Sequence, residues 1–224
     1  MRLPVRGMQG ALLFVFCLLN FRTDSYALDL QDVLSGFQRH YASVETAAGS
    51  FRQTYRAPGI DQEESGVFWL KKPGLMRWEY RDPEEKLFVA DGREFYLYVP
   101  RDRQVTVQPY SVSDLHRTPL EFLLGARDIQ GSFLVSWETD FKRKIERTHL
   151  IRLTPRQSVT EYEFLILEFD QETYELRRIV IREAGGNTSE FFLTDVTTNV
   201  KLDKKTFQFK PPTGTEILQL DDER

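Results

Sequence analysis

The side chains best suited to catalysis or metal binding are few and scattered along the chain. The 224 residues contain three histidines, His40, His116 and His149, and a single cysteine, Cys17. The histidines do not have the H-E-x-x-H spacing of a zinc site, and no G-x-S-x-G segment presents a nucleophilic serine. We therefore interpret the histidines as surface or interface residues.

Carboxylates for acid–base chemistry are also not gathered. Adjacent acidic pairs occur at positions 63–64, 84–85 and 221–222, at turns or at the end of the chain, where solvated charge is the simpler explanation. Residues 187–189 match a glycosylation sequon, which matters only in a eukaryotic secretory pathway. No glycine-rich loop is suited to cradling a phosphate. We expect a protein that is not an enzyme, with no catalytic residue, no metal and no cofactor.

The charge of the chain argues against a nucleic-acid partner. The formal net charge is -4, and no block of Lys and Arg is present. A protein that binds nucleic acid through phosphates needs a basic surface. We therefore expect no nucleic acid among the partners.

The first residues resemble an export signal. Arg2 and Arg6 precede an apolar run at residues 11–21, and Ser25-Tyr26-Ala27 has the small-x-small form of a cleavage site. We predict a signal peptide at residues 1–27, cleaved after Ala27, and a single domain at residues 28–224. An uncleaved membrane anchor is the alternative.

Cys17 lies inside this apolar run, so the processed chain would contain no thiol. The residue before it, Phe16, is large, whereas a lipid-modified cysteine follows a small residue. We do not expect the protein to be a lipoprotein itself.

Hydrophobic periodicity predicts one helix followed by strands. Apolar residues recur at steps of three and four over residues 28–44, which is the spacing of an amphipathic helix. The period then changes to two, and turn residues separate the segments. The predicted strands are residues 48–55, 65–71, 75–80, 86–90, 94–99, 105–109, 148–154, 162–169, 176–182, 190–196 and 207–210. A short helix is predicted near residues 118–125, within an insert of the kind that often forms a lid or binding loop.

One face of each predicted strand carries no charge, and that face is rich in aromatic residues. Phe, Tyr and Trp together make up 13% of the chain. One helix and one insert present too few side chains to fill a sheet of about eleven strands, so we predict a partly hollow structure. A solidly packed aromatic core is the alternative. The predicted lining is Phe51, Phe68, Leu70, Met76, Trp78, Tyr80, Phe95, Leu97, Val105, Val107, Ile179, Ile181, Phe191, Leu193 and Phe207.

Several segments resemble the LolA family of outer-membrane lipoprotein carriers, in the family's order. They are GSFRQTY at 49–55, SGVFWLKKPGLMRWEY at 65–80, DGREFYLYVP at 91–100, QVTVQPY at 104–110, TPLEFLLG at 118–125 and FQFKPPTGTEI at 207–217. The W-L-K-K-P-x-x-x-x-W block followed by D-G-x-x-x-x-x-Y and the late F-x-F-x-P-P is the specific part.

The resemblance implies a mainly β protein: an unclosed antiparallel β-barrel with helices as a lid over an apolar cavity. It implies a periplasmic carrier that accepts acylated lipoproteins from an inner-membrane ABC transporter and passes them to an outer-membrane receptor. We expect a monomer. The family's lid arginine is replaced by Lys72, and the corresponding lid helix would contribute Leu120, Phe122 and Leu123. We expect the Lys72 ammonium to bind carbonyls at the end of that helix.

Two other functions remain open from the sequence. The same scaffold could carry or sense other lipids, such as glycolipids. A lipid-processing hydrolase is the second alternative, and it would require a serine, aspartate and histidine that the spacing does not bring together.

Overall fold

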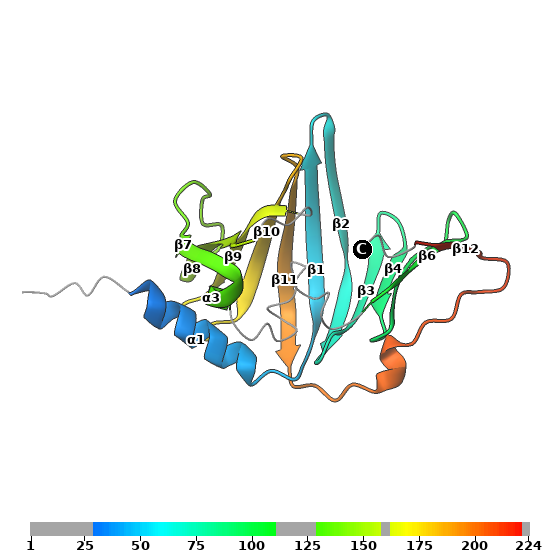
Figure 1. The fold of residues 1–224 in the computed structure, drawn as a ribbon, viewed down its shortest axis with the longest axis horizontal. Helices are drawn as coiled ribbons and strands as arrows, with labels where there is room; N and C mark the ends of the chain where they lie inside the picture. The colour runs from blue at the N-terminus through cyan, green and yellow to red at the C-terminus, as the bar shows by residue number, and fades with distance from the viewer. Residues whose placement is uncertain (1–28, 111–128, 158–161, 221–224) are drawn as a thin grey trace, which may run out of the picture.

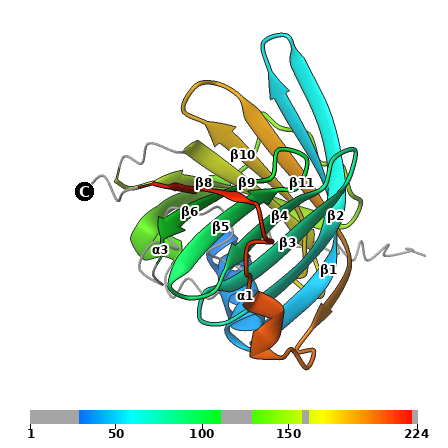
Figure 2. The ribbon, with the colours of Figure 1, turned by 90° about the vertical axis from the view of Figure 1, so that its right-hand side faces the viewer.

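The computed structural model describes residues 29–110, 129–157 and 162–220, which form one curved sheet with a helix inside the curve (Figures 1 and 2). The helical elements are α1 (Leu30–Ala42), α3 (Ile129–Ser132) and the 3-10 helix η2 (Lys204–Phe207). The strands are β1 (Thr46–Ala57), β2 (Ile60–Lys71), β3 (Leu75–Asp82), β4 (Lys86–Ala90), β5 (Glu94–Val99), β6 (Gln104–Pro109), β7 (Phe133–Trp137), β8 (Thr148–Pro155), β9 (Tyr162–Asp170), β10 (Leu176–Glu183), β11 (Thr188–Thr198) and β12 (Glu216–Gln219).

The sheet has 12 strands in the order β12-β6-β5-β4-β3-β2-β1-β11-β10-β9-β8-β7. β12 and β7 do not pair with each other, so the barrel is unclosed, as expected. Neighbouring strands are antiparallel, except that β12 runs parallel to β6. The mainly β, unclosed sheet confirms the predicted fold class, and its one parallel pairing involves β12, a strand that was not predicted.

Ten of the eleven predicted strands are present, and the eleventh is not. Residues 207–210 alternate as a strand would, but Phe207 ends η2, where the Asp203 carboxylate accepts a hydrogen bond from the Lys205 N–H at 2.9 Å. This capping side chain stabilises the helical turn and competes with strand pairing. β7 and β12 were not predicted from the sequence.

The long β1–β2 and β2–β3 hairpins turn at Pro-Gly sequences. Gly59 and Gly74 have φ values of 75° and 89°, a left-handed conformation that glycine adopts without strain. These turns were predicted, and the second one joins the strands that carry Phe68 and Trp78.

α1 begins at Asp29, whose carboxylate accepts a hydrogen bond from the Gln31 N–H at 3.0 Å. Its buried stripe packs on β9 and β10, where the rings of Phe37 and Phe169 lie 4.6 Å apart. Gly36 allows the close approach, because a Cβ there would lie 2.2 Å from the ring of Tyr174. α1 confirms the predicted N-terminal helix. The strands curve around it (Figure 2).

Both faces of the sheet carry apolar clusters. The large cluster lies on the concave face and includes the buried stripe of α1. On the outer face, Val89, Tyr96, Val105 and Val107 form a second cluster over β4–β6, beside Phe209. Leu150, Ile166 and Val180 form a third over β8–β10. Both faces of the sheet thus bury apolar side chains, but the curvature of the sheet encloses only the concave face.

Candidate functional site

The register of the β2–β3 hairpin places its largest side chains on the concave face. Phe68 lies opposite Trp78, and Leu70 lies opposite Met76. Directly opposed residues in antiparallel strands point to the same side of the sheet. Both pairs are buried in the concave cluster.

Trp78 is at the centre of a group of aromatic rings from four strands. Its ring lies 4.7 Å from Phe51 on β1, 4.9 Å from Phe68 on β2 and 5.9 Å from Phe191 on β11. Offset or edge contacts at these distances add stabilisation beyond the apolar area buried. The strand order β3-β2-β1-β11 brings together residues far apart in the sequence.

A row of rings continues across the next strands. Tyr80 lies 5.6 Å from Phe88, Phe88 lies 5.7 Å from Phe95, and Phe95 lies 6.4 Å from Tyr110. The Tyr80 hydroxyl donates a hydrogen bond to the Gln53 Oε1 at 2.6 Å, and burial raises the pKa of this tyrosine. Together with the rings around Trp78, this row forms the concave wall. Within it, the Tyr80 hydroxyl has a hydrogen-bond partner.

Several apolar side chains on this concave wall are only half-buried: Phe88, Phe95, Ile181, Phe191 and Val196. A solidly filled core would leave side chains at the centre of a curved sheet inaccessible. The concave face therefore retains accessible apolar surface.

Most of the predicted lining residues are brought together in this cluster. The structure groups Phe51, Phe68, Leu70, Met76, Trp78, Tyr80, Phe95, Ile179, Ile181, Phe191 and Leu193. Leu97 is half-buried and lies opposite Phe88, which places it on the same face. Phe88 and Tyr110 were missed, because residues 87–90 are apolar on both faces and Tyr110 follows the end of β6.

Three predicted lining residues lie elsewhere. Val105 is opposite Tyr98 and Val107 is opposite Tyr96, so both valines belong to the outer cluster. Phe207 is buried in η2, and the Arg77 guanidinium, on the outer face, donates to the Thr206 carbonyl at 3.3 Å. Assigning these three residues to the concave face was wrong, because alternation does not say which apolar face turns inward.

Lys72 binds the end of a helix, but the helix is α1. Its Nζ donates to the Tyr41 carbonyl at 2.6 Å, and its N–H donates to the Glu45 carbonyl at 2.9 Å. Burial lowers the pKa of Lys72, an effect that Glu45 partly offsets. Leu120, Phe122 and Leu123 of the predicted lid lie outside the described residues, so their contact with Lys72 stays a prediction.

The histidines form no catalytic group in the described parts of the chain. His149 is buried between the rings of Trp137 and Phe169, within the fold, so its interpretation as a surface or interface residue is wrong. Burial lowers the pKa of both His40 and His149. Residues 29–110, 129–157 and 162–220 hold no cluster of three metal-ligating side chains, and no helix among them has the length and hydrophobicity needed to span a membrane.

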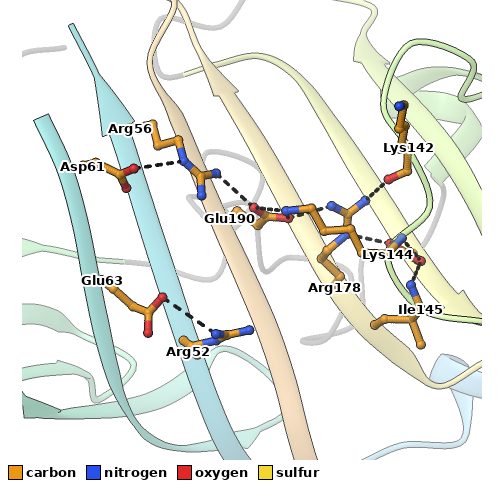
Figure 3. Close-up of polar contacts among 10 residues, drawn as sticks. Arg52, Arg56, Asp61, Glu63, Lys142, Lys144, Ile145, Arg178 and Glu190 are labelled. Atoms are coloured by element: carbon orange, nitrogen blue, oxygen red, sulfur yellow. Dashed lines mark hydrogen bonds and ion pairs between the residues drawn. The ribbon is translucent and has the colours of Figure 1, made fainter. Parts of the chain in front are cut away.

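A buried charge network lies on the outer face of β9–β11 (Figure 3). The Arg178 guanidinium contacts Glu168 and Glu190, each at 2.6 Å, and donates to the Lys142 carbonyl at 3.0 Å. Lys144 reaches Glu190 at 2.8 Å. The sequence analysis missed this network because its members are far apart along the chain.

The network secures residues 142–145 against the sheet. Glu168 accepts the backbone N–H groups of Lys144 and Ile145 and the Thr148 hydroxyl, at 2.8–3.0 Å. Lys144 and Arg178 hold the pKa of Glu190 below its usual range, against the opposing effect of burial. These charges are structural partners of one another and do not face the concave cluster.

The outer face also has an open pocket of ≈ 430 Å³, lined in part by Arg77, Glu79, Arg81, Leu87 and Tyr98. Three of its charged side chains are paired, since Glu79 contacts Arg77 at 2.8 Å and Arg81 at 3.4 Å. This pocket is open to solvent and has ionised side chains around it, so it is a poorer site for an acyl chain than the concave wall.

The family of the chain follows from comparison with known proteins. The model of the family "Outer membrane lipoprotein carrier protein LolA" matches residues 42–210, most of the chain. The chain belongs to the LolA family. The resemblance predicted from the sequence is therefore confirmed, and this family consists of carrier proteins and not of enzymes.

Individual relatives agree with this LolA membership. An outer-membrane lipoprotein carrier protein of Alkalilimnicola ehrlichii is 29% identical over 184 residues, covering 81% of each chain. One from Legionella pneumophila is 28% identical over 208 residues, covering 92% of this chain and 98% of its own. Among solved structures, an uncharacterized conserved protein from Thermus thermophilus has a TM-score of 0.53 at 10% identity, covering 85% of this chain and 98% of that one. It shares the fold.

Proposed function

We propose that the protein is a periplasmic carrier that shelters the acyl chains of lipoproteins released from the inner membrane and delivers them to the outer membrane. The observation that carries this proposal is the concave aromatic wall, whose half-buried side chains Phe88, Phe95 and Phe191 offer apolar surface inside an unclosed sheet. LolA-family membership supports lipoproteins as the cargo.

The binding strength of such a wall suits a carrier. Each buried CH₂ contributes about 0.8 kcal/mol, so sheltering roughly ten methylenes would yield about 8 kcal/mol and an affinity near micromolar. Cargo bound with this affinity can transfer to an acceptor whose site is more apolar. Aromatic and Met side chains suit cargo whose chains are flexible.

The remaining parts of the proposal concern processing and partners. Residues 1–27 would act as a signal peptide cleaved after Ala27, leaving residues 28–224 as one domain. The partners would be acylated lipoproteins, an inner-membrane ABC transporter and an outer-membrane receptor, with the carrier acting as a monomer. Lys72, Leu120, Phe122 and Leu123 would control a lid.

The proposal is tested with a peptide that carries an S-dipalmitoylglyceryl cysteine, incubated with the processed protein. Phe191→Glu and Trp78→Glu place a charge on the concave wall and should abolish binding. Trp69→Glu is the matched control, because Trp69 lies opposite Arg77 on the outer face, next to Phe68 in the same strand. Unfolding of Trp78→Glu alone would favour a solid core at that position, whereas unchanged binding by both wall variants would refute the proposal.

The cargo is identified by mass spectrometry of molecules that co-purify from the periplasm. Triacylated lipoprotein is expected. Recovery of glycolipids without lipoprotein would instead favour the alternative lipid carrier on the same scaffold.

A further inference from the structure

The indole N–H of Trp78 has no hydrogen-bond partner among the residues that the structure describes. Its side chain is 4% exposed, and its indole Nε1 is buried with no hydrogen-bond acceptor among the described residues. Buried N–H groups are nearly always paired, because an unpaired donor loses its bonds to water without replacement. An acceptor that is not part of the described protein would remove this cost.

Three tyrosine hydroxyls of the concave cluster have hydrogen-bond partners. The Tyr80 hydroxyl donates to Gln53, the Tyr110 hydroxyl donates to the Gly74 carbonyl at 3.1 Å, and the Tyr41 hydroxyl accepts the Leu176 N–H at 2.9 Å. The Trp78 indole is therefore a donor of the concave wall that has no partner among the described residues.

The side chains around this donor are apolar. Phe51, Phe68 and Phe191 surround the Trp78 ring at 4.7–5.9 Å, and the residue opposite Trp78 on β4 is Phe88. None of these has an oxygen or nitrogen in its side chain. A ligand that satisfies the indole must therefore bring its own acceptor into the wall.

We propose that the Trp78 indole N–H donates a hydrogen bond to an acyl carbonyl oxygen of the bound cargo, and so selects acyl chains over alkyl chains. This inference rests on the proposed function. Ester and amide carbonyl oxygens only accept hydrogen bonds, and the indole N–H only donates, so the two are complementary. The carbonyl would set the position of the chain, whose methylenes would contact the half-buried rings of Phe88, Phe95 and Phe191.

The test compares two cysteine peptides that differ only in their chains, S-dipalmitoylglyceryl and its dihexadecyl ether counterpart. Trp78→Phe keeps an aromatic ring and removes the N–H. It should weaken binding of the ester peptide about fivefold and leave the ether peptide within about twofold of the wild type, as expected for one hydrogen bond. Trp69→Phe is the matched control and should change neither affinity.

A second measurement does not depend on the fit of the smaller ring. With a ¹³C label in the ester carbonyls, the infrared stretching frequency of one carbonyl should fall on binding to the wild type and not on binding to Trp78→Phe. Equal weakening of both peptides, or no infrared shift in the wild type, would overturn the inference while leaving the carrier function intact. Failure of the wild type to bind either peptide would overturn the proposed function and the inference with it.

Discussion

Arg178→Met removes the central cation of the network on the outer face. In the wild type, Arg178 contacts Glu168 and Glu190 at 2.6 Å, and the side chains of these two glutamates are 0% and 4% exposed. Glu190 keeps Lys144, but Glu168 loses its only ion-pair partner among the described residues. Breaking a buried pair by removing one partner costs about 3–5 kcal/mol.

We therefore expect Arg178→Met to lower the free energy of unfolding by about 3–5 kcal/mol, a large part of the roughly 5–15 kcal/mol typical of a domain. Urea unfolding followed by circular dichroism measures the loss. Hydrogen exchange should also quicken at the amides of Lys144 and Ile145, which donate to Glu168. Acyl binding should persist under native conditions, because the network lies on the opposite face from the concave wall.

Two controls make the prediction specific. Arg147→Met breaks an exposed pair with Glu172, whose side chains are 71% and 72% exposed, and should cost less than about 1 kcal/mol. Adding Glu168→Gln to Arg178→Met removes the unpaired charge while keeping an oxygen that accepts the backbone N–H groups, so stability should partly return. A loss below about 1 kcal/mol for Arg178→Met, or no recovery in the double variant, would refute the reasoning.

Three further predictions concern stability. Lys72→Met should lower the free energy of unfolding by about 1–2 kcal/mol and speed amide exchange in the last turn of α1, because the Tyr41 carbonyl loses its charged donor, whereas Lys72→Arg should retain most of it. Gly36→Ala should lower the free energy of unfolding by about 1 kcal/mol despite the better helix propensity of alanine, since its Cβ would meet the Tyr174 ring. In a Tyr174→Ala background the same substitution should raise the free energy of unfolding. Calorimetry that finds destabilisation in both backgrounds would contradict the packing argument. Because the pKa of Glu190 is lowered in the folded protein, the stabilisation from its charge is present above the pKa of an unfolded glutamate, about 4.3, and is lost as the pH falls through the folded value. Glu190→Gln should therefore reduce the slope of the unfolding free energy against pH below about 4.3. An unchanged slope would contradict this.

Much of the fold was determined by local sequence. The stripe of α1 and the two-residue alternation of ten strands are short-range patterns, and Pro-Gly turns end the long hairpins where glycine adopts a positive φ. On β3 one face carries Arg77 and Glu79 and the other carries Met76, Trp78 and Tyr80, so only the second face is suited to burial. The concave position of Trp78 follows from that asymmetry.

Where both faces of a strand are apolar, tertiary structure decided which face turns inward. It also decided the ion pairs between residues that are distant in sequence. Val105 and Val107 alternate like lining residues, yet their pairing with Tyr98 and Tyr96 turns them outward, under Phe209. The contacts of Arg178 with Glu168 and of Lys144 with Glu190 depend on which strands are neighbours. Sequence periodicity carries the direction of each side chain relative to its own strand, but only strand pairing and sheet curvature determine which direction is inside.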